Sequence, residues 1–330
     1  MIPWPRFVDI VQHHQRFLLT AHIRPDGDSL GSEMAMIGIL EGLGKDVLVC
    51  NAFPVPPNLR FLDPDGRLKQ LGVDISAEQL ADREVGIVLD TSAWAQLGDM
   101  AKVIQAFRGL KVIVDHHVSQ DDLGAEVFKD PDAEAAGRLV IDAADQLGVA
   151  LTPAIAVPAF VALATDTGWF RFSSTTASTL ALASRLVAAG AAPDALYRQI
   201  YENDSHSRLQ LIGHALVRAE TELGGRLIHT WLSQNDFTTC GAIPSDSEDI
   251  INMTLSVKGT RVAVIFVEQA SGGFKVSLRS RCDIDCSRLA GLFGGGGHKK
   301  AAGAFFHDSL EVARQKMLDA VRAAIQSAGQ

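Results

Sequence analysis

The chain has 330 residues, of which 47% are hydrophobic and 21% are charged, and its formal net charge is −9. These values are typical of a globular protein with room for two domains. The acidic balance argues against a protein that follows long nucleic acid, because phosphate contacts require a basic surface. Apolar runs stay well short of the ~20 residues of a membrane-spanning helix, and the N-terminus lacks signal-peptide features.

The first half of the chain alternates short apolar runs with segments of helical spacing. The apolar runs predict strands at residues 17–21, 45–50, 85–89 and 111–114. Helical spacing is found at residues 29–43, 96–108 and 133–147, and residues 153–164 are apolar on all sides, as in a buried helix. This alternation indicates an α/β domain with a parallel sheet covered by helices on both faces.

The second half of the chain has a different pattern. A helical region at residues 176–223 is expected to join two lobes, and the character changes after Gly224 and Gly225. Strands are predicted at residues 227–232, 261–268 and 275–279, and helices at residues 285–292 and 309–326. The predicted organisation is a catalytic domain at 1–190, a helical linker at 191–224 and a smaller α+β domain at 225–330.

Side chains that ligate metals follow the predicted strands of the first half. They are His22, Asp26 and Asp28 after the first strand, Asp90 after the third, Asp115, His116 and His117 after the fourth, and Asp166 after the buried helix. Because the carboxyl ends of parallel strands meet at one edge of a sheet, we expect these groups to converge there.

Each of these residues also has an ordinary explanation when it is taken alone. Asp28 and Asp90 are typical helix caps, and Asp166 is a typical turn residue. Together, however, several carboxylates cannot crowd into one place without positive charge, because each raises the pKa of the others. The pattern therefore predicts a pair of divalent cations, Mn²⁺ or Mg²⁺ by ligand type. Such pairs are a recurring device for hydrolysing phosphoesters.

A glycine-rich segment in the second half predicts an anion site. Gly294–Gly297 precede His298, Lys299 and Lys300, and glycine allows backbone N–H groups to approach an anion closely. A flexible linker is the ordinary explanation of such a run. Arg279, at the end of a predicted strand, either faces the same anion or lies on a solvated surface.

These motifs together resemble the DHH phosphoesterase superfamily, named for the triplet at Asp115–His117. The first lobe is similar to the DHH domain in its segments 22–32, 90–92, 115–117 and 165–168, and the second is similar to the DHHA1 domain in Gly294–His298 followed by Ala301–Gly303. The two-lobe layout at this length is most similar to the NrnA-type oligoribonucleases, or nanoRNases. The resemblance implies an active site in the cleft between the two domains.

The resemblance also assigns roles to individual residues. One Mn²⁺ is expected on His22, Asp26 and Asp90, and a second on Asp28, Asp90, His116 and Asp166, with Mg²⁺ or Co²⁺ as alternatives. His117 is expected to contact the scissile phosphate, and Asp115 to orient the neighbouring histidine. Substrate is expected on Arg279, Gly295, Gly296, Gly297 and His298.

The function implied by the resemblance is hydrolysis of short oligoribonucleotides to 5′-mononucleotides. The acidic charge agrees with substrates of about two to five nucleotides, and with no binding of long duplexes or membranes. Removal of the 3′-phosphate of 3′-phosphoadenosine 5′-phosphate (PAP) is a possible further activity.

One alternative is cleavage of linear dinucleotides derived from cyclic-dinucleotide signalling. An alternative of another class is a nucleotide- or RNA-binding module without turnover. The pattern leaves open whether the chain is a monomer or a homodimer. Four scattered cysteines suit the cytoplasm.

Overall fold

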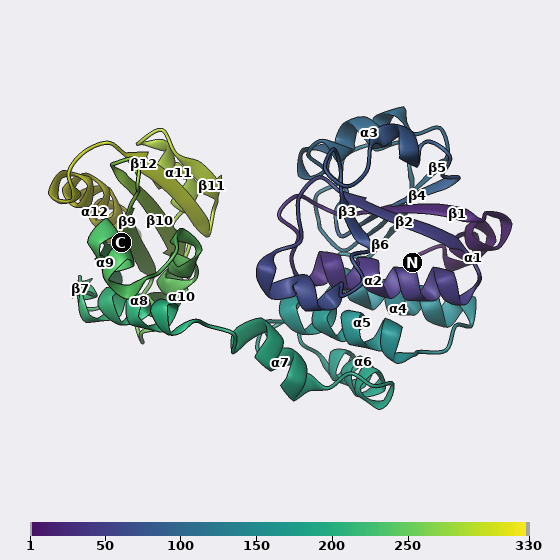
Figure 1. Ribbon diagram of the computed structural model, residues 1–330. Helices are drawn as coiled ribbons and strands as arrows, with labels where there is room; N and C mark the ends of the chain where they lie inside the picture. Colours follow the sequence, from purple (N-terminus) through teal and green to yellow (C-terminus); the bar gives the residue numbers. More distant parts are fainter. Residues whose placement is uncertain (1, 328–330) are drawn as a thin grey trace. The chain divides into compact units, whose positions relative to one another are not determined.

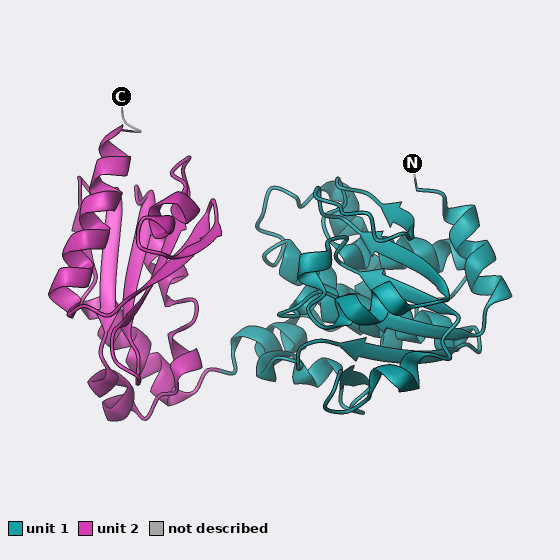
Figure 2. Cartoon of the chain, turned by 90° about the horizontal axis from the view of Figure 1, so that it is seen from above, with its two compact units in different colours: residues 1–203 teal, residues 204–330 magenta. Residues whose placement is uncertain are grey.

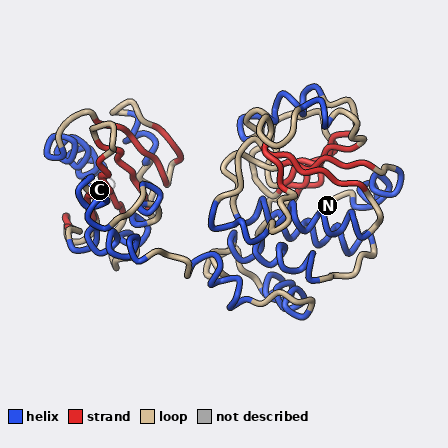
Figure 3. Tube along the Cα trace, in the orientation of Figure 1, coloured by secondary structure: helices blue, strands red, loops and turns tan. Residues whose placement is uncertain are grey.

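A computed structural model describes residues 2–327 of the chain. The chain forms two compact units, residues 1–203 and residues 204–330 (Figure 2). The division lies between Asn203 and Asp204, inside the segment that the sequence assigns to a linker. Each unit has its own sheet with helices packed on it (Figure 3).

Unit 1 is built on a parallel six-stranded sheet in the order β3-β2-β1-β4-β5-β6. The strands are β1 (Arg16–Thr20), β2 (Asp46–Asn51), β3 (Leu68–Gln70), β4 (Val85–Leu89), β5 (Leu110–Asp115) and β6 (Glu126–Lys129). The helices are α1 (Trp4–His13), α2 (Gly27–Gly42), α3 (Met100–Ala106), α4 (Ala136–Leu147), α5 (Pro153–Asp166), α6 (Ala177–Ala188) and α7 (Pro193–Tyr201), with 3₁₀ turns η1 (Pro57–Leu62), η2 (Ala77–Leu80) and η3 (Trp94–Gln96). Helices α2 and α4 lie on one face of the sheet and α3 on the other (Figure 1).

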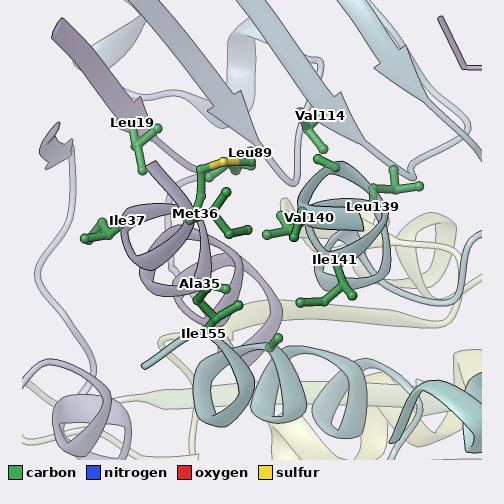
Figure 4. Packing of buried hydrophobic residues seen from close by; sticks show 14 of the residues in the cluster. Leu19, Ala35, Met36, Ile37, Leu89, Val114, Leu139, Val140, Ile141 and Ile155 are labelled. Atoms are coloured by element: carbon green, nitrogen blue, oxygen red, sulfur yellow. The ribbon is translucent and has the colours of Figure 1, made fainter. Parts of the chain in front are cut away.

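Burial on both faces explains why the strands of unit 1 read as continuous apolar runs. All five residues of β4 are buried. On one face, Leu89 belongs to the cluster formed with Met36 of α2 and Val140 of α4 (Figure 4). On the other face, Val88 belongs to a separate cluster with Met100 of α3. The sheet is thus a covered central layer whose loops at one edge are free to carry a site.

Helices α2 and α5 approach each other closely because glycines face the contact. A Cβ atom at Gly31 would overlap the carbonyl oxygen of Pro158, and a Cβ atom at Gly27 would lie 2.5 Å from Oγ1 of Thr165. Gly38, near the other end of α2, faces Ile155 near the start of α5. The helices therefore run antiparallel, and the N-terminus of α2 lies beside the C-terminus of α5.

Unit 2 contains a mixed six-stranded sheet in the order β11-β12-β10-β9-β8-β7. The strands are β7 (Glu220–Glu222), β8 (Leu227–Leu232), β9 (Val262–Glu268), β10 (Phe274–Ser280), β11 (Gly296–His298) and β12 (Ala301–Phe306). The helices are α8 (His206–Val217), α9 (Gln234–Cys240), α10 (Ile250–Leu255), α11 (Cys286–Gly291) and α12 (Leu310–Ser327), with the 3₁₀ turn η4 (Pro244–Ser247). The side chains of α11 and α12 pack on one face of the sheet, and those of α8, α9 and α10 pack on the other.

The structure confirms the predicted α/β architecture and corrects several element boundaries. The helix expected at residues 29–43 begins at Gly27, because Asp26 rather than Asp28 is its N-cap. Only Met100–Ala106 is α-helical within residues 96–108. The helical region expected at residues 176–223 is divided into α6, α7 and α8, and strand β7 follows it. Among residues 2–327, no helix is both long and apolar enough to cross a lipid bilayer.

Candidate metal centre and substrate face

The six residues expected to ligate metals lie together at the carboxyl edge of the unit 1 sheet. His22, Asp26 and Asp28 come from the connection between β1 and the first turn of α2. Asp90 directly follows β4, and His116 directly follows β5. Asp166 is the last residue of α5, which reaches the site because α2 and α5 are antiparallel.

The first cluster consists of His22, Asp26 and Asp90. Nε2 of His22 lies 3.2 Å from Oδ2 of Asp90 and 3.7 Å from Oδ1 of Asp26. Each of the three residues offers one ligand atom, and these three atoms all lie within 4.8 Å of one another. A single cation could therefore contact all of them. These are the residues expected to hold the first ion.

The second cluster consists of Asp28, His116 and Asp166, and Asp90 adjoins it. Nε2 of His116 lies 3.6 Å from Oδ2 of Asp28, 3.7 Å from Oδ2 of Asp166 and 3.3 Å from Oδ1 of Asp90. The two carboxylate oxygens of Asp90 thus face different histidines, one in each cluster. This is the arrangement that a bridging carboxylate requires.

Both histidines are oriented by backbone carbonyl groups. Nδ1 of His22 lies 2.7 Å from the carbonyl oxygen of Ile23, and Nδ1 of His116 lies 3.1 Å from that of Ala133. A hydrogen bond donated by Nδ1–H fixes each ring and leaves Nε2 facing the carboxylates. The rings are therefore held in the orientation of metal ligands.

Asp28 has a structural role besides its place in the second cluster. Its Oδ2 accepts a hydrogen bond from the backbone N–H of Ala136 at 2.7 Å, and its Oδ1 accepts one from that of Gly137 at 2.9 Å. These N–H groups open α4, whose own N-cap position is Ala135 and has no polar side chain. Asp28 therefore caps α4 from a different helix and is fixed in place by it.

Asp90 combines an unusual backbone with a buried oxygen that lies 3.3 Å from Nε2 of His116 without accepting a hydrogen bond. Its φ is 58°, in the left-handed region, which Asp and Asn tolerate better than most residues. Its side chain is 3% exposed, and Oδ1 accepts no hydrogen bond within the part of the chain that the structure describes. A buried carboxylate oxygen in this state is costly unless a cation neutralises it.

The crowding of charges shifts the pKa values of the surrounding groups. Burial, together with the charges of Asp90 and Asp166, raises the pKa of Asp28 well above its usual range. Burial also raises the pKa of Asp166 to about 6, against the influence of His116. Although burial opposes their charge, neighbouring carboxylates raise the pKa of His22 to about 11 and that of His116 to about 10. In the absence of a cation, the protonated forms of these imidazoles and carboxyl groups are therefore favoured, which reduces the negative charge of the site.

His117 lies beside this centre in a different environment. Its Nδ1 is 2.8 Å from Oδ1 of Asp115, and its side chain is 50% exposed. Asp115 is fully buried and accepts hydrogen bonds from Ser92 at 2.6 Å and from the backbone of His117 at 3.0 Å. The hydrogen bond with Asp115 raises the pKa of His117. The structure therefore pairs Asp115 with His117, whose Nε2 is left for another partner.

The residues of the two clusters fit a pair of divalent cations. They offer imidazole nitrogen and carboxylate oxygen, which suit Mn²⁺ and Mg²⁺. Three groups of three ligand atoms lie close enough to hold one ion each: the two clusters, and a third formed by Asp90, His116 and His117. Asp90 faces His22 through Oδ2 and His116 through Oδ1. Positive charge placed here would also relieve the mutual repulsion of Asp28, Asp90 and Asp166.

Sequence reasoning missed residues that support the site from outside it. Nζ of Lys129, at the end of β6, lies 3.1 Å from Oδ2 of Asp115. Glu33 of α2 is fully buried and accepts a hydrogen bond from Nδ2 of Asn51 at 2.8 Å. Asn51 in turn accepts the backbone N–H of Ala21, the residue before His22, at 2.9 Å. A glutamate within an apolar helical face was the available signal for this second network.

The glycine-rich segment of unit 2 is an edge strand rather than a loop that wraps an anion. Gly296–His298 form β11, which pairs antiparallel with β12. A Cβ atom at Gly295 would overlap the carbonyl oxygen of Gly303, and a Cβ atom at Gly297 would lie 2.6 Å from that of Ala301. These two glycines are therefore required by close strand packing. A Cβ atom at Gly296 meets open space among the described residues.

Arg279 and His298 lie on the same face of this sheet. Arg279 of β10 pairs with Ala301 of β12, and Ala301 pairs with His298 of β11. Directly paired residues of antiparallel strands project to the same side, so the small Ala301 is the residue that separates the two. Gly296 belongs to this face as well, two residues before His298 on the same strand.

Family models match most of both units. Residues 16–164 match the N-terminal domain of the DHH family, and residues 237–327 match the DHHA1 domain. A relative from Thermus thermophilus, named bifunctional oligoribonuclease and PAP phosphatase NrnA, is 31% identical over 94% of this chain and 90% of its own length. The chain belongs to the DHH family of phosphoesterases. The family resemblance expected from the motifs is thus confirmed.

Other members of the DHH family extend this similarity. A Bacillus subtilis protein, also named bifunctional oligoribonuclease and PAP phosphatase NrnA, is 24% identical over 91% of this chain and 92% of its own length. The crystal structure of an exopolyphosphatase-related protein from Bacteroides fragilis has a TM-score of 0.91 at 24% identity, covering 99% of this chain and 97% of that chain. Exonuclease RecJ bound to manganese has a TM-score of 0.53 at 14% identity, covering 97% and 94%. These two structures share the fold.

Proposed function

We propose that this chain is a divalent-metal-dependent phosphodiesterase that hydrolyses short oligoribonucleotides to 5′-mononucleotides. The observation that carries the proposal is the pair of ligand clusters that meet at Asp90, whose buried Oδ1 has no hydrogen-bond partner among the described residues. The names of the Thermus thermophilus and Bacillus subtilis relatives support the substrate class, and they support removal of phosphate from PAP as a further activity.

We propose that the two clusters would hold two cations, Mn²⁺ by preference. The first ion would be held by His22, Asp26 and Asp90, and the second by Asp28, Asp90, His116 and Asp166. When bound, such ions supply Lewis-acid chemistry, which activates water and neutralises phosphate oxygens. The chain contributes rigidity, because Asp28 is fixed on the N-terminus of α4 and both histidines are fixed on backbone carbonyls.

His117 is the group that we propose for contact with the scissile phosphate. Its ring is half exposed, and its Nδ1 is held by Asp115, so that Nε2–H is available to donate to a phosphate oxygen. The hydrogen bond with Asp115 raises the pKa of His117, which favours the protonated imidazole. Asp115 is thus a positioning residue, which Ser92 and Lys129 hold in turn.

The face of unit 2 that carries Arg279 and His298 is proposed to hold the substrate. Both side chains project to one side of the sheet, and Gly296 and Ala301 keep the surface between them low. A single arginine and a single histidine suit a short substrate held at few phosphates, in agreement with the acidic net charge. The free cysteines of the described residues agree with a cytoplasmic location.

The decisive experiment replaces Asp90 by asparagine and measures Mn²⁺-dependent cleavage of a diribonucleotide. Asn retains the left-handed backbone of Asp90, where alanine would add strain. We expect kcat to fall at least ~1,000-fold, because a charged ligand shared by both clusters is lost. Asp65→Asn, on an exposed loop, is the matched control and should retain activity. Full activity of Asp90→Asn would refute the proposal.

A substrate panel separates the possible activities. Diribonucleotides, longer oligoribonucleotides and PAP should be compared by kcat/KM with Mn²⁺ and with Mg²⁺. A binding module would retain tight binding of two ions per chain without hydrolysing any of these substrates. Hydrolysis that is fastest for the shortest oligonucleotides is the result that the proposal requires.

A further inference from the structure

One face of the unit 2 sheet is covered over only part of its width. Side chains of α8, α9 and α10 pack on β8 and β9, where Ala263, Ile265 and Val267 are buried. On the same face, β10 presents Lys275, which is exposed, and Ser277 and Arg279, which are partly exposed. The opposite face is covered by α11 and α12. The structure thus leaves an open platform formed by β10, β12 and β11.

The strand register orders the residues of this platform into rows. Arg279, Ala301 and His298 form the row already proposed to hold substrate. Lys275 pairs with Phe305 in another row, four residues from Arg279 along β10. Four residues of an extended strand span about 13 Å. This distance is longer than one nucleotide unit, so the second row lies beyond the nucleotide held at the first.

The second row offers a cation and an aromatic ring, the two kinds of group that contact phosphates and bases. Nζ of Lys275 makes no ion pair or hydrogen bond with any residue in 2–327, although the chain carries a net charge of −9. The ring of Phe305 is 40% exposed beside it and lies against His307, with ring centroids 4.8 Å apart. Exposed aromatic rings on a sheet are platforms on which single-stranded RNA bases stack. Gly303 lies between the two rows on β12 and has no side chain, so nothing projects from this position to separate the rows.

A cavity of about 1100 Å³ adjoins the β10 residues of both rows, on the side away from β12. Lys275, Ser277 and Arg279 form one side of it, and Phe237 of α9 and Ile251 of α10 belong to the other. Three acidic residues also line it: Glu248 and Asp249 before α10, and Glu268 of β9, which accepts a hydrogen bond from the backbone N–H of Gln234. The basic side chains of this lining, Lys275 and Arg279, both lie on β10, so phosphates are favoured along this strand. The cavity volume of about 1100 Å³ exceeds the ~300–1,000 Å³ typical of small-molecule sites, so it has room for more than one nucleotide.

We propose that Lys275 and Phe305 form a second nucleotide subsite, which binds the part of an oligoribonucleotide beyond the nucleotide held by Arg279 and His298. Lys275 contacts a phosphate, and Phe305 stacks on a base. The inference rests on the proposed function, because it takes a short oligoribonucleotide as the ligand. Its consequence is that the subsite contributes to binding of trinucleotides and leaves dinucleotides unaffected.

The test compares 5′-phosphorylated di- and triadenylate with Mn²⁺ in the full-length protein. Lys275→Ala is expected to lower kcat/KM for the trinucleotide about 10-fold through KM, as loss of one charged hydrogen bond does. Phe305→Leu, which retains an apolar cover over Gly273, is expected to cause a similar loss through stacking. Lys275→Arg should restore the trinucleotide value. Lys258→Ala, which removes an equal charge from an exposed turn, is the matched control.

Equal losses for both substrates with Lys275→Ala would overturn the inference, because Lys275 would then belong to the first subsite. Unchanged values for both substrates would overturn it as well. Equilibrium binding of the trinucleotide in EDTA, measured by calorimetry, tests the subsite without turnover. A wild-type protein that binds the trinucleotide more tightly than Lys275→Ala but cleaves neither substrate would refute the proposed function while supporting the subsite.

Discussion

Replacement of Glu33 by glutamine tests whether this buried carboxyl group, next to the candidate metal centre, makes the free energy of unfolding depend on pH. Glu33 lies on α2 and is fully buried, and its Oε1 has no hydrogen-bond partner among the described residues. Burial, only partly offset by the hydrogen bond from Asn51, raises the pKa of Glu33 from 4.5 to about 8. The charges of His22, Asp90 and Asp63 act on the same carboxyl group. Glutamine has the shape of the protonated side chain and cannot ionise.

The raised pKa predicts the sign and the size of the effect. Below pH 4.5, Glu33 is protonated in both the folded and the unfolded chain. Between pH 4.5 and about 8 the unfolded chain releases this proton and the folded chain retains it, so the free energy of unfolding decreases as the pH rises. Each pH unit costs up to ~1.4 kcal/mol, and because the carboxyl group is only partly ionised near both limits, the total between pH 5 and pH 8 is about 3.5 kcal/mol. Glu33→Gln does not incur this cost.

The assay is urea denaturation of both proteins in EDTA at pH 5 and at pH 8. We expect the variant to gain about 3.5 kcal/mol over the wild type on going from pH 5 to pH 8. Glu41→Gln, which removes only a surface ion pair with Arg67 from the exposed side of the same helix, is the control and should change the free energy of unfolding by less than ~1 kcal/mol at either pH. A difference between variant and wild type that does not depend on pH, or that favours the wild type at pH 8, would refute this reasoning.

Three other substitutions test packing, positioning and strand geometry. Gly31→Ala should lower the free energy of unfolding by about 2 kcal/mol, since the new methyl group would overlap the backbone of α5. The control is Gly42→Ala on the same helix, where a methyl group meets open space within the described residues and should be neutral or slightly stabilising. Thermal denaturation measures both effects. Asp115→Asn should lower kcat about 10- to 100-fold with little change in Mn²⁺ affinity by calorimetry, and equal loss of both would contradict a positioning role. Gly295→Ala should destabilise unit 2, whereas Gly296→Ala should retain stability and raise KM for oligoribonucleotides.

The sequence was sufficient to predict the central strands and the residues at their ends. Strands β1, β2, β4 and β5 are buried on both faces, and they appear in the sequence as uninterrupted apolar runs. The edge strands β3 and β6 are three and four residues long and partly exposed, so no such run marks them. Helix α1 was missed because its apolar residues, Phe7, Ile10 and Val11, form a short stripe between prolines and polar residues.

The site could be predicted as a set of residues but not as a network. The clustering of His22, Asp90 and His116 follows from their positions after parallel strands. By contrast, the capping of α4 by Asp28 joins groups 108 residues apart, and periodicity carries no signal of such a contact. The strand within the glycine segment was not predicted, for a similar reason. Its composition suits a flexible loop, and the requirement for Gly295 and Gly297 becomes apparent only when β12 lies beside them.

The backbone of Asp90 limits how this protein can lose its chemistry through natural variation. At a φ of 58°, Gly, Asn and Asp fit with little strain, whereas branched and bulky residues do not. A single base change converts an aspartate codon to one for asparagine or glycine. Descendants that have abandoned catalysis should therefore carry one of these two residues at position 90 and keep an intact fold. Sequencing of divergent paralogues provides a record against which this expectation can be checked.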